Sequence, residues 1–191
     1  MIWKTRQIGE KELSGVKLVG DSFLNLRFAG VEMRLSSFEK CVFKECDFNG
    51  VIIQDSGFIE ADFQGSRVSN LDLSVGYFRK CNFNEVVAEG TVFRQLRKSD
   101  ERLEWMDLRS VSFVKADLSG AIFMKCRLNE ADFRGAKLDR CVFENCDLSK
   151  ANFSEADLVG VNFEGCRIEN TVLDMGGFVS IGQAKGFVLS D

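Results

Sequence analysis

Several residue types are missing or scarce in this chain, and each absence excludes a class of protein. The 191 residues contain no histidine, no proline and a single tyrosine. Without histidine there is no imidazole base for a Ser-His or Cys-His pair. Neither a Gly-x-x-x-x-Gly-Lys-[Ser/Thr] nor a Gly-x-Gly-x-x-Gly phosphate-binding motif occurs. We therefore expect that the chain is not an enzyme and that it binds no cofactor and no small-molecule substrate.

Long apolar runs and an excess of positive charge are also absent. No stretch approaches the ~20 apolar residues that a membrane span needs. Residues 1–10 are too polar for a signal peptide, so the expected location is the cytoplasm, without membrane contact. The formal net charge is −4 at pH 7, which argues against direct binding of nucleic acid, because that favours a basic face.

The seven cysteines lack the spacing of a metal or redox site. No Cys-x-x-Cys occurs, and the cysteines lie five or multiples of five residues apart. All seven share one phase of a five-residue period, which predicts that they point to the same side of the chain. We interpret them as buried free thiols that act as small hydrophobic residues, with no metal bound.

Apolar residues, in contrast, occupy every fifth position in one register. From Ile8 to Phe178 only Lys98 breaks this rule, and seventeen of the eighteen phenylalanines follow it, Phe187 being the exception. A period of five fits neither a helix nor a strand, whose side chains repeat every 3.6 and 2.0 residues. It predicts a square coil in which each side is one repeat and sends one large side chain inward.

Two further phases of the repeat support this coil. The residue two before each large one is mostly small or apolar, as at Ala131 and Cys141, and predicts a second inward position. Ten glycines lie two residues after the large one, where a corner of positive φ selects glycine. Asp or Asn often precedes the large residue, as Asp132 precedes Phe133, and can hydrogen-bond to the backbone of the corner.

These repeats resemble those of the pentapeptide-repeat proteins. Segments such as Ala131-Asp132-Phe133-Arg134-Gly135 and Ala151-Asn152-Phe153-Ser154-Glu155 carry the likeness, which extends over about residues 11–178. The resemblance implies an all-β fold, a right-handed quadrilateral β-helix of about eight coils with four repeats in each. We expect this domain to span residues 1–178 and a short non-repeat cap to span residues 179–191.

The repeat is interrupted near residues 94–105. Lys98 falls in the phase of the large inward residues and Glu101 in the phase of the small ones, and neither would be buried without a partner. We expect a loop or short helical bulge between Gln95 and Arg102. Repeat scaffolds often bind partners with such loops. A tolerated insertion is the alternative; the candidate partner contacts are Arg94, Arg97, Lys98, Arg102 and Trp105.

Acidic residues form lengthwise stripes if the interruption leaves the order of faces unchanged. Four repeats per coil then place one set of acids on a single face, and the opposite face is acidic as well. Such stripes present charge as a DNA duplex does and would attract a basic DNA-binding groove. The alternative is that any rod in water needs surface charge. The candidate contacts on the first face are Glu45, Asp62, Glu85, Glu144 and Glu164, with Glu104 in the same phase.

The C-terminal segment leaves the repeat but stays apolar. A solenoid end must be capped, because its open strand edges would otherwise aggregate. The segment resembles the tail of the Qnr-type quinolone-resistance proteins, which implies a homodimer; a monomeric cap is the alternative. Gly176, Gly177 and Gly182 depart from that tail and count against a local helix. The candidate dimer contacts are Phe178, Ile181, Phe187, Val188 and Leu189.

The resemblance to the Qnr and mycobacterial Mfp-type proteins also carries a functional expectation. It implies an interaction protein that binds a type II topoisomerase, DNA gyrase or topoisomerase IV, by imitating DNA, and so protects against fluoroquinolones. The alternative is a scaffold or regulatory interaction protein unrelated to topoisomerases, because a fold does not determine a function.

Overall fold

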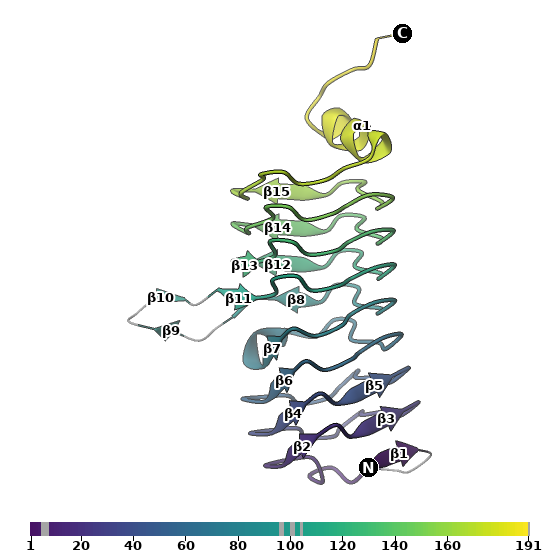
Figure 1. Ribbon diagram of the computed structural model, residues 1–191, viewed down its shortest axis with the longest axis vertical. Helices are drawn as coiled ribbons and strands as arrows, with labels where there is room; N and C mark the ends of the chain where they lie inside the picture. The colour runs from purple at the N-terminus through teal and green to yellow at the C-terminus, as the bar shows by residue number, and fades with distance from the viewer. Residues whose placement is uncertain (5–7, 96–97, 100–101, 104, 191) are drawn as a thin grey trace.

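The chain forms a rod of stacked coils with a hairpin on one side and a helix at the C-terminal end (Figure 1). This computed structural model describes residues 1–4, 8–95, 98–99, 102–103 and 105–190, and of residues 98–99 and 102–103 only the backbone. The first and last coils lie at opposite ends of the rod. Among the described residues no helix is long and apolar enough to cross a membrane.

Short strands run along the sides of the coils and pair in parallel with the coils above and below. Three sheets stack in the orders β1-β3-β5, β2-β4-β6-β7 and β15-β14-β12-β8, and a fourth pairs β11 with β13. Only the hairpin strands β9 and β10 are antiparallel among the described strands. The elements are β1 (Ile2–Lys4), β2 (Lys17–Val19), β3 (Ser22–Leu24), β4 (Ser37–Glu39), β5 (Val42–Lys44), β6 (Gly57–Ile59), the 3-10 helix η1 (Leu73–Val75), β7 (Tyr77–Arg79), β8 (Val92–Phe93), β9 (Lys98–Ser99), β10 (Arg102–Leu103), β11 (Met106–Asp107), β12 (Ile122–Met124), β13 (Cys126–Arg127), β14 (Val142–Glu144), β15 (Asn162–Glu164) and the helix α1 (Met175–Ala184).

One coil takes twenty residues, as four five-residue sides require. Phe23 pairs with Phe43 in the first sheet, and Phe38 with Phe58 in the second. Isolated bridges, such as Arg27 to Asp47, continue the ladder where no strand is assigned. The predicted fold, a β-helix of about eight coils, is therefore confirmed.

The inward residues fill the interior as columns of stacked rings. Phe133 is fully buried between Phe113 and Phe153, with ring centroids 5.1 Å and 4.7 Å away. Rings on neighbouring columns meet edge to face, as Phe133 does with Phe143 at 5.7 Å. Both arrangements are favourable for aromatic pairs. The predicted core is thus a continuous column of packed side chains.

The corners of the coil have the geometry that the repeat predicts. Every described residue with positive φ, apart from Gly186, has a number divisible by five, and eighteen of these residues are not glycine. The Asx residue before the large one accepts a hydrogen bond from the backbone N–H two residues later, as Asp132 does from Arg134 at 3.1 Å. This bond recurs at Asp47, Asp62, Asp72, Asn82, Asp107, Asp117, Asp147, Asn152 and Asp157.

The interruption inserts ten residues, 96–105, into the coil. Phe83 stacks on Phe113 at 5.3 Å and Phe93 on Phe123 at 4.4 Å, so the coil spans thirty residues here instead of twenty. The described backbone of the insertion is the β9–β10 hairpin, which projects from the rod (Figure 1). The described backbone thus leaves the coil where the sequence predicts an interruption, and it forms a β-hairpin instead of a helical bulge.

The C-terminal helix was not expected. Asp174 caps it, because its carboxylate accepts a hydrogen bond from the Gly177 backbone N–H at 2.8 Å. A Cβ added to Gly177 would lie 3.0 Å from Leu158, so glycine lets the helix approach the last coils closely. The helix begins at Met175, inside the range expected for the repeats, and Phe178 is 69% exposed instead of pointing into the core.

Candidate interaction surfaces

The rod has four long faces, which we name by their inward residues. Face A carries Phe43 before the hairpin and Phe133 after it, and the coil then passes through face B, face C and face D. Face C carries Phe93 and Phe123, and face D carries Phe78 before the hairpin and Leu128 after it. Face B lies between faces A and C and carries Phe48 and Leu138.

The insertion exchanges opposite faces, which corrects the expected stripe. Ten residues are two repeats, or half a coil, so Glu144 and Glu164 lie on face C. Glu45, Asp62 and Glu85 lie on face A, on the opposite side of the rod. The expectation that all five acids lie on one face is therefore wrong. Three of them lie on face A and two on face C.

Faces A and C are nevertheless both acidic. Among the described residues face A has six outward acids and four bases, and face C has six acids and three bases. The acids are Glu45, Asp62, Glu85, Asp132, Glu155 and Asp174 on face A, and Glu12, Glu32, Asp55, Asp72, Glu144 and Glu164 on face C. The bases are Lys4, Lys44, Lys115 and Arg134 on face A, and Arg34, Arg94 and Lys125 on face C.

The acidic candidates differ in how freely they meet solvent. Asp62 is half-buried, and it accepts hydrogen bonds from the Gln64 backbone N–H at 3.0 Å and the Asn82 amide at 2.9 Å. Glu45 and Glu85 stand at corners of positive φ and are exposed. The corner glutamates are thus free to contact a partner, whereas Asp62 helps to hold the coil.

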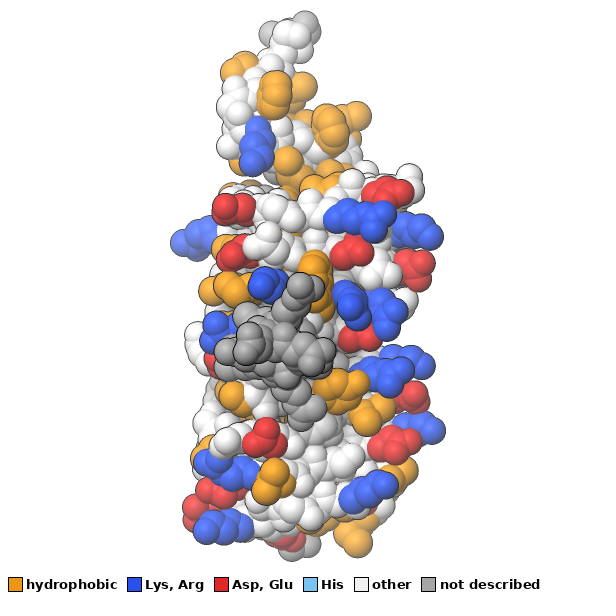
Figure 2. Space-filling view, turned by 90° about the vertical axis from the view of Figure 1, so that its left-hand side faces the viewer, with side chains coloured by type: hydrophobic (Ala, Val, Ile, Leu, Met, Phe, Trp, Pro, Cys, Tyr) orange, Lys and Arg blue, Asp and Glu red, His pale blue; other side chains and the backbone are white. Residues whose placement is uncertain are grey.

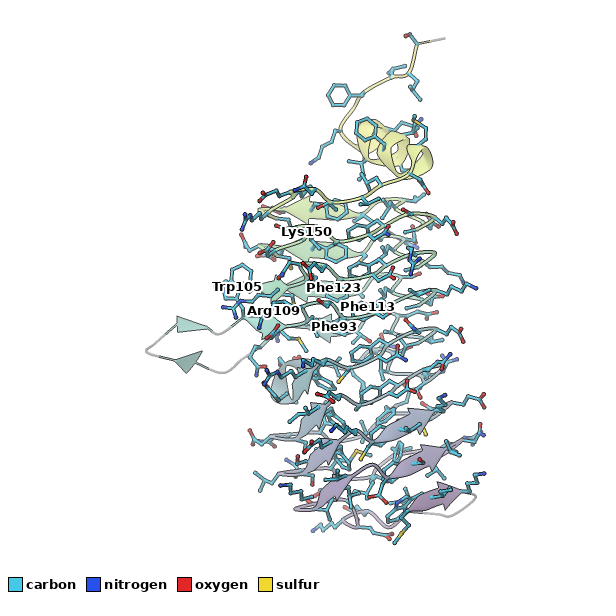
Figure 3. All side chains as sticks on the ribbon, viewed as in Figure 1. Phe93, Trp105, Arg109, Phe113, Phe123 and Lys150 are labelled. Carbon is cyan, nitrogen blue, oxygen red and sulfur yellow. The ribbon has the colours of Figure 1, made fainter. Side chains whose placement is uncertain are left out.

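The hairpin candidates can be placed only in part. Arg94 pairs with Asp72 at 3.0 Å. Partial burial of Asp72 opposes its ionisation, but hydrogen bonds from Ser74 and Arg94 outweigh this and lower the pKa of Asp72. Trp105 stands at the root of the hairpin and is 40% exposed (Figure 3). Arg97 and the side chains of Lys98 and Arg102, like Glu104, lie outside the described residues.

An apolar groove of about 680 Å³ opens between α1 and the last coil. All five candidate dimer contacts, Phe178, Ile181, Phe187, Val188 and Leu189, line it. Ile168 and Met175 line it too, at 59% and 78% exposure, and sequence reasoning did not select them. Ile168 follows the inward register, and only its place in the last coil, with no coil above it, leaves it uncovered.

The cysteines form no disulfide, and six of the seven are buried. Cys126, Cys146 and Cys166 stack in one column, because the backbone N–H of Cys126 contacts the Cys146 sulfur at 3.5 Å and that of Cys146 contacts the Cys166 sulfur at 3.4 Å. Burial raises the pKa of the Cys81 thiol to about 12. The described residues contain no group of three or more potential metal ligands. These thiols pack the coil.

Comparison with known proteins supports the family assignment. Residues 126–165 match eight copies of the family described as pentapeptide repeats. No curated protein sequence matches the chain. Two trypsin-treated variants of QnrB1, a plasmid-mediated fluoroquinolone resistance protein, are similar in structure. The first has a TM-score of 0.54 and 19% identity over 96% of both chains. The second has a TM-score of 0.53 and 17% identity over 100% of this chain and 98% of that one.

HetL, a pentapeptide-repeat protein involved in the regulation of heterocyst differentiation in the cyanobacterium Nostoc, is also similar. Its TM-score is 0.33, with 18% identity over 84% of this chain and 90% of HetL. At these identities the likenesses concern the fold alone. Residues 126–165 therefore carry the repeats of the pentapeptide-repeat family, and the coil built from such repeats has the pentapeptide-repeat β-helix fold.

Proposed function

We propose that the protein is a cytoplasmic interaction module that binds a type II topoisomerase, DNA gyrase or topoisomerase IV, by DNA mimicry and so protects it from fluoroquinolones. The observation that carries this proposal is the pair of acidic faces, A and C, on opposite sides of a rod that shares its fold with QnrB1. A basic DNA-binding groove attracts such a rod by electrostatic complementarity. The exposed corner glutamates Glu45 and Glu85 are the contacts that this docking favours on face A.

The proposal includes a homodimer formed through the C-terminal groove. The five predicted contacts line one apolar groove, and Phe178, Phe187 and Val188 are each more than two thirds exposed. An apolar surface of this kind is stabilised when a partner covers it. Two rods joined at this end would double the length over which the acidic faces run.

A supercoiling assay tests the function. Purified protein is titrated into DNA gyrase with ciprofloxacin, and recovery of supercoiling is measured; we expect recovery, or inhibition of supercoiling at high protein. The variant Glu45→Lys/Glu85→Lys should weaken this effect. Its matched control, Glu10→Lys/Glu89→Lys, changes the charge by the same amount at two exposed glutamates on face B. No effect of the folded wild-type protein on gyrase would overturn the proposal.

The second candidate is a scaffold or regulatory interaction protein unrelated to topoisomerases. Face D favours it, because its bases outnumber its acids among the described residues, which is opposite to the charge of DNA. The bases are Lys17, Lys40, Arg79, Lys80, Arg109, Arg127, Lys150 and Arg167, and the acids are Glu39, Glu60, Asp107, Glu130, Asp147 and Glu169. A pull-down that recovers one partner other than a topoisomerase, together with an inactive gyrase assay, would support this candidate.

A further inference from the structure

Charges of opposite sign recur one above the other along the rod. Residues that pair across neighbouring coils form a column, in which successive side chains are ~4.8 Å apart. Asp47 pairs with Arg67 on face B in this way, and Arg127 pairs with Asp147 on face D. Lys and Arg side chains accordingly lie among Asp and Glu side chains on the side of the rod that carries the hairpin (Figure 2). Stacked charges of opposite sign offset each other and leave little net charge for a ligand.

Arg79 on face D departs from this alternation. In the preceding coil it pairs with Ile59. In the next coil its column holds Arg109, because β11 lies against β7 and the register across the insertion advances by thirty residues. Arg79 is exposed and forms no ion pair among the described residues. Two arginines thus follow each other in one column with no carboxylate between them in that column.

A surface hollow of about 540 Å³ lies around these two arginines. Lys80, Ser110 and Asn129 line it as well, together with the carboxylates Asp107 and Glu130. Each of the lining residues that the structure describes is polar or charged, so they offer hydrogen bonds and charge but no apolar wall. A nucleobase or another ring needs a surface to stack on, whereas a small charged group does not. The hollow therefore fits a small charged group.

Both acids in the hollow are already paired with bases. Asp107 accepts hydrogen bonds from Nε and Nη2 of Arg109 at 2.7 and 2.6 Å, and these bonds lower the pKa of Asp107. Glu130 lies 3.7 Å from Lys150, which is on the same side of the rod as Arg109 (Figure 3). The positive charge of Arg79 therefore remains without a counter-charge among the described residues, and the hollow attracts anions.

Arg109 and Lys80 supply further donors beside Arg79. Asp107 uses two of the five N–H groups of the Arg109 guanidinium and holds it in place, which leaves three for a ligand. Lys80 is 65% exposed, and its Nζ lies 4.0 Å from a Glu60 oxygen, a loose ion pair. An anion in the hollow can therefore meet two guanidinium groups and one ammonium group, the donors by which proteins bind phosphate.

We propose that Arg79, Lys80 and Arg109 bind a phosphate group that is carried by a phosphorylated side chain of a partner protein. Such a group has three acceptor oxygens and a charge of about −1.5 to −2 at pH 7, which match the three donor groups. The hollow is larger than one phosphate group, so it also holds part of the residue that carries the group.

The surroundings of the hollow favour a single phosphate over a nucleic acid. A smaller hollow of about 220 Å³ adjoins it and is lined by Asp147 and Glu169. These acids would repel the neighbouring phosphates of a continuous backbone. The proposed site lies on face D, apart from acidic faces A and C and from the C-terminal groove, and so goes beyond the proposed function.

Fluorescence anisotropy tests the site with a labelled peptide that carries one phosphoserine among glycine and serine residues. The wild-type protein should bind this peptide and not the same peptide with unmodified serine. A peptide with glutamate in place of phosphoserine should bind about fivefold more weakly or worse, because a carboxylate has less charge and fewer oxygens. Inorganic phosphate should compete only at higher concentration than the phosphopeptide, because it leaves most of the hollow empty.

A pair of matched variants locates the site. Arg79→Gln should weaken binding of the phosphopeptide by about tenfold, the equivalent of ~1.4 kcal/mol. Its side chain is exposed and has no ion pair among the described residues, so the variant should fold as the wild type does, which circular dichroism checks. The control, Arg67→Gln, removes an exposed arginine on face B and should change binding by less than about twofold.

The pH dependence gives a second readout. The charged groups around the hollow are Arg79, Lys80, Arg109, Asp107 and Glu130, and the chain has no histidine. Arginine, lysine and carboxylates ordinarily titrate outside the range from about pH 5.5 to 7.5, whereas a phosphate monoester has its second pKa near 6. The phosphopeptide should therefore bind about threefold more tightly or better at the upper end, and the glutamate peptide should bind almost equally at both.

Several outcomes would overturn the site: binding of the serine or glutamate peptide as tight as that of the phosphopeptide, equal losses in both variants, or tighter binding of a labelled DNA duplex. Inorganic phosphate that competes as well as the phosphopeptide would overturn the assignment to a partner protein. The gyrase assay separates the two proposals, because Arg79→Gln leaves faces A and C intact and should still protect gyrase.

Discussion

At the scale of single residues, the corner of each repeat sets the backbone and tolerates many side chains. Leu35 adopts φ 52° and is 74% exposed, a conformation that costs a branched side chain about 1–2 kcal/mol compared with glycine. We expect Leu35→Asn to raise the free energy of unfolding by about 0.5–1 kcal/mol, because asparagine tolerates this conformation. Urea unfolding measures it. Gly30→Ala, at a corner of φ 74° with open space around it, should lower stability and serves as the opposite control.

The inward phenylalanines carry the stability of the stack. Phe133 is fully buried between two stacked rings, so Phe133→Ala should lower the free energy of unfolding by about 3–5 kcal/mol. Phe178→Ala follows the same five-residue register but removes a side chain that is 69% exposed, and should cost far less in the monomer. Thermal and urea unfolding of both variants compare them. Similar losses would mean that α1 packs more tightly than the exposure of Phe178 indicates.

At the scale of elements, the hairpin is a ten-residue unit that the coil does not need. Joining Gln95 to Met106 creates an uninterrupted repeat, Met106-Asp107-Leu108-Arg109-Ser110. We expect deletion of residues 96–105 to leave the β-helix folded, with thermal stability near that of the wild type, and to weaken gyrase protection. Circular dichroism and the supercoiling assay measure the two effects. Deleting eight residues instead, 95–102, breaks the five-residue register and should destabilise the rod.

The coil was predictable from the sequence because most repeats carry the same three signals, an inward apolar residue that is often phenylalanine, a small residue and a corner. The order of the faces was not predictable. An insertion of ten residues preserves the five-residue phase, so Leu108 and Phe113 continue the register of Phe83 and Phe93. It shifts the twenty-residue coil by half a turn, and pairings across the insertion, such as Phe83 with Phe113, reveal this. The five-residue phase thus predicts which residues are buried, whereas the pairing of neighbouring coils determines which outward residues share a face.

The C-terminal helix could not be predicted from the sequence either, for a different reason. Glycine disfavours a helix by ~1 kcal/mol at each position, so Gly176, Gly177 and Gly182 argue against one. The Asp174 cap and the close packing of Gly177 on Leu158 act in the opposite direction. Both depend on the position of the last coil. Sequence reasoning nevertheless selected five residues that line one groove, because apolar residues beyond the last repeat have no core of their own to enter.

At the scale of the whole molecule, the two ends of the rod are closed differently. Trp3 stacks on Phe23 at 5.2 Å and covers the first coil, whereas Ile168 in the last coil remains 59% exposed beside the groove. Association through the C-terminal end would cover that apolar surface and favours a two-fold dimer, in which the same patch meets itself.

Light scattering tests this association. The wild-type chain, of 21.5 kDa, should show about twice that mass, and Phe178→Asp should shift the mass toward the monomer, because a carboxylate would be buried without a partner. Leu35→Asp is the matched control, since it places the same charge on an equally exposed apolar side chain far from the groove. If the wild-type protein at high concentration had the mass of a single chain, this result would contradict the proposed dimer. Each rod would then have to engage its partner with the acidic faces of one chain alone.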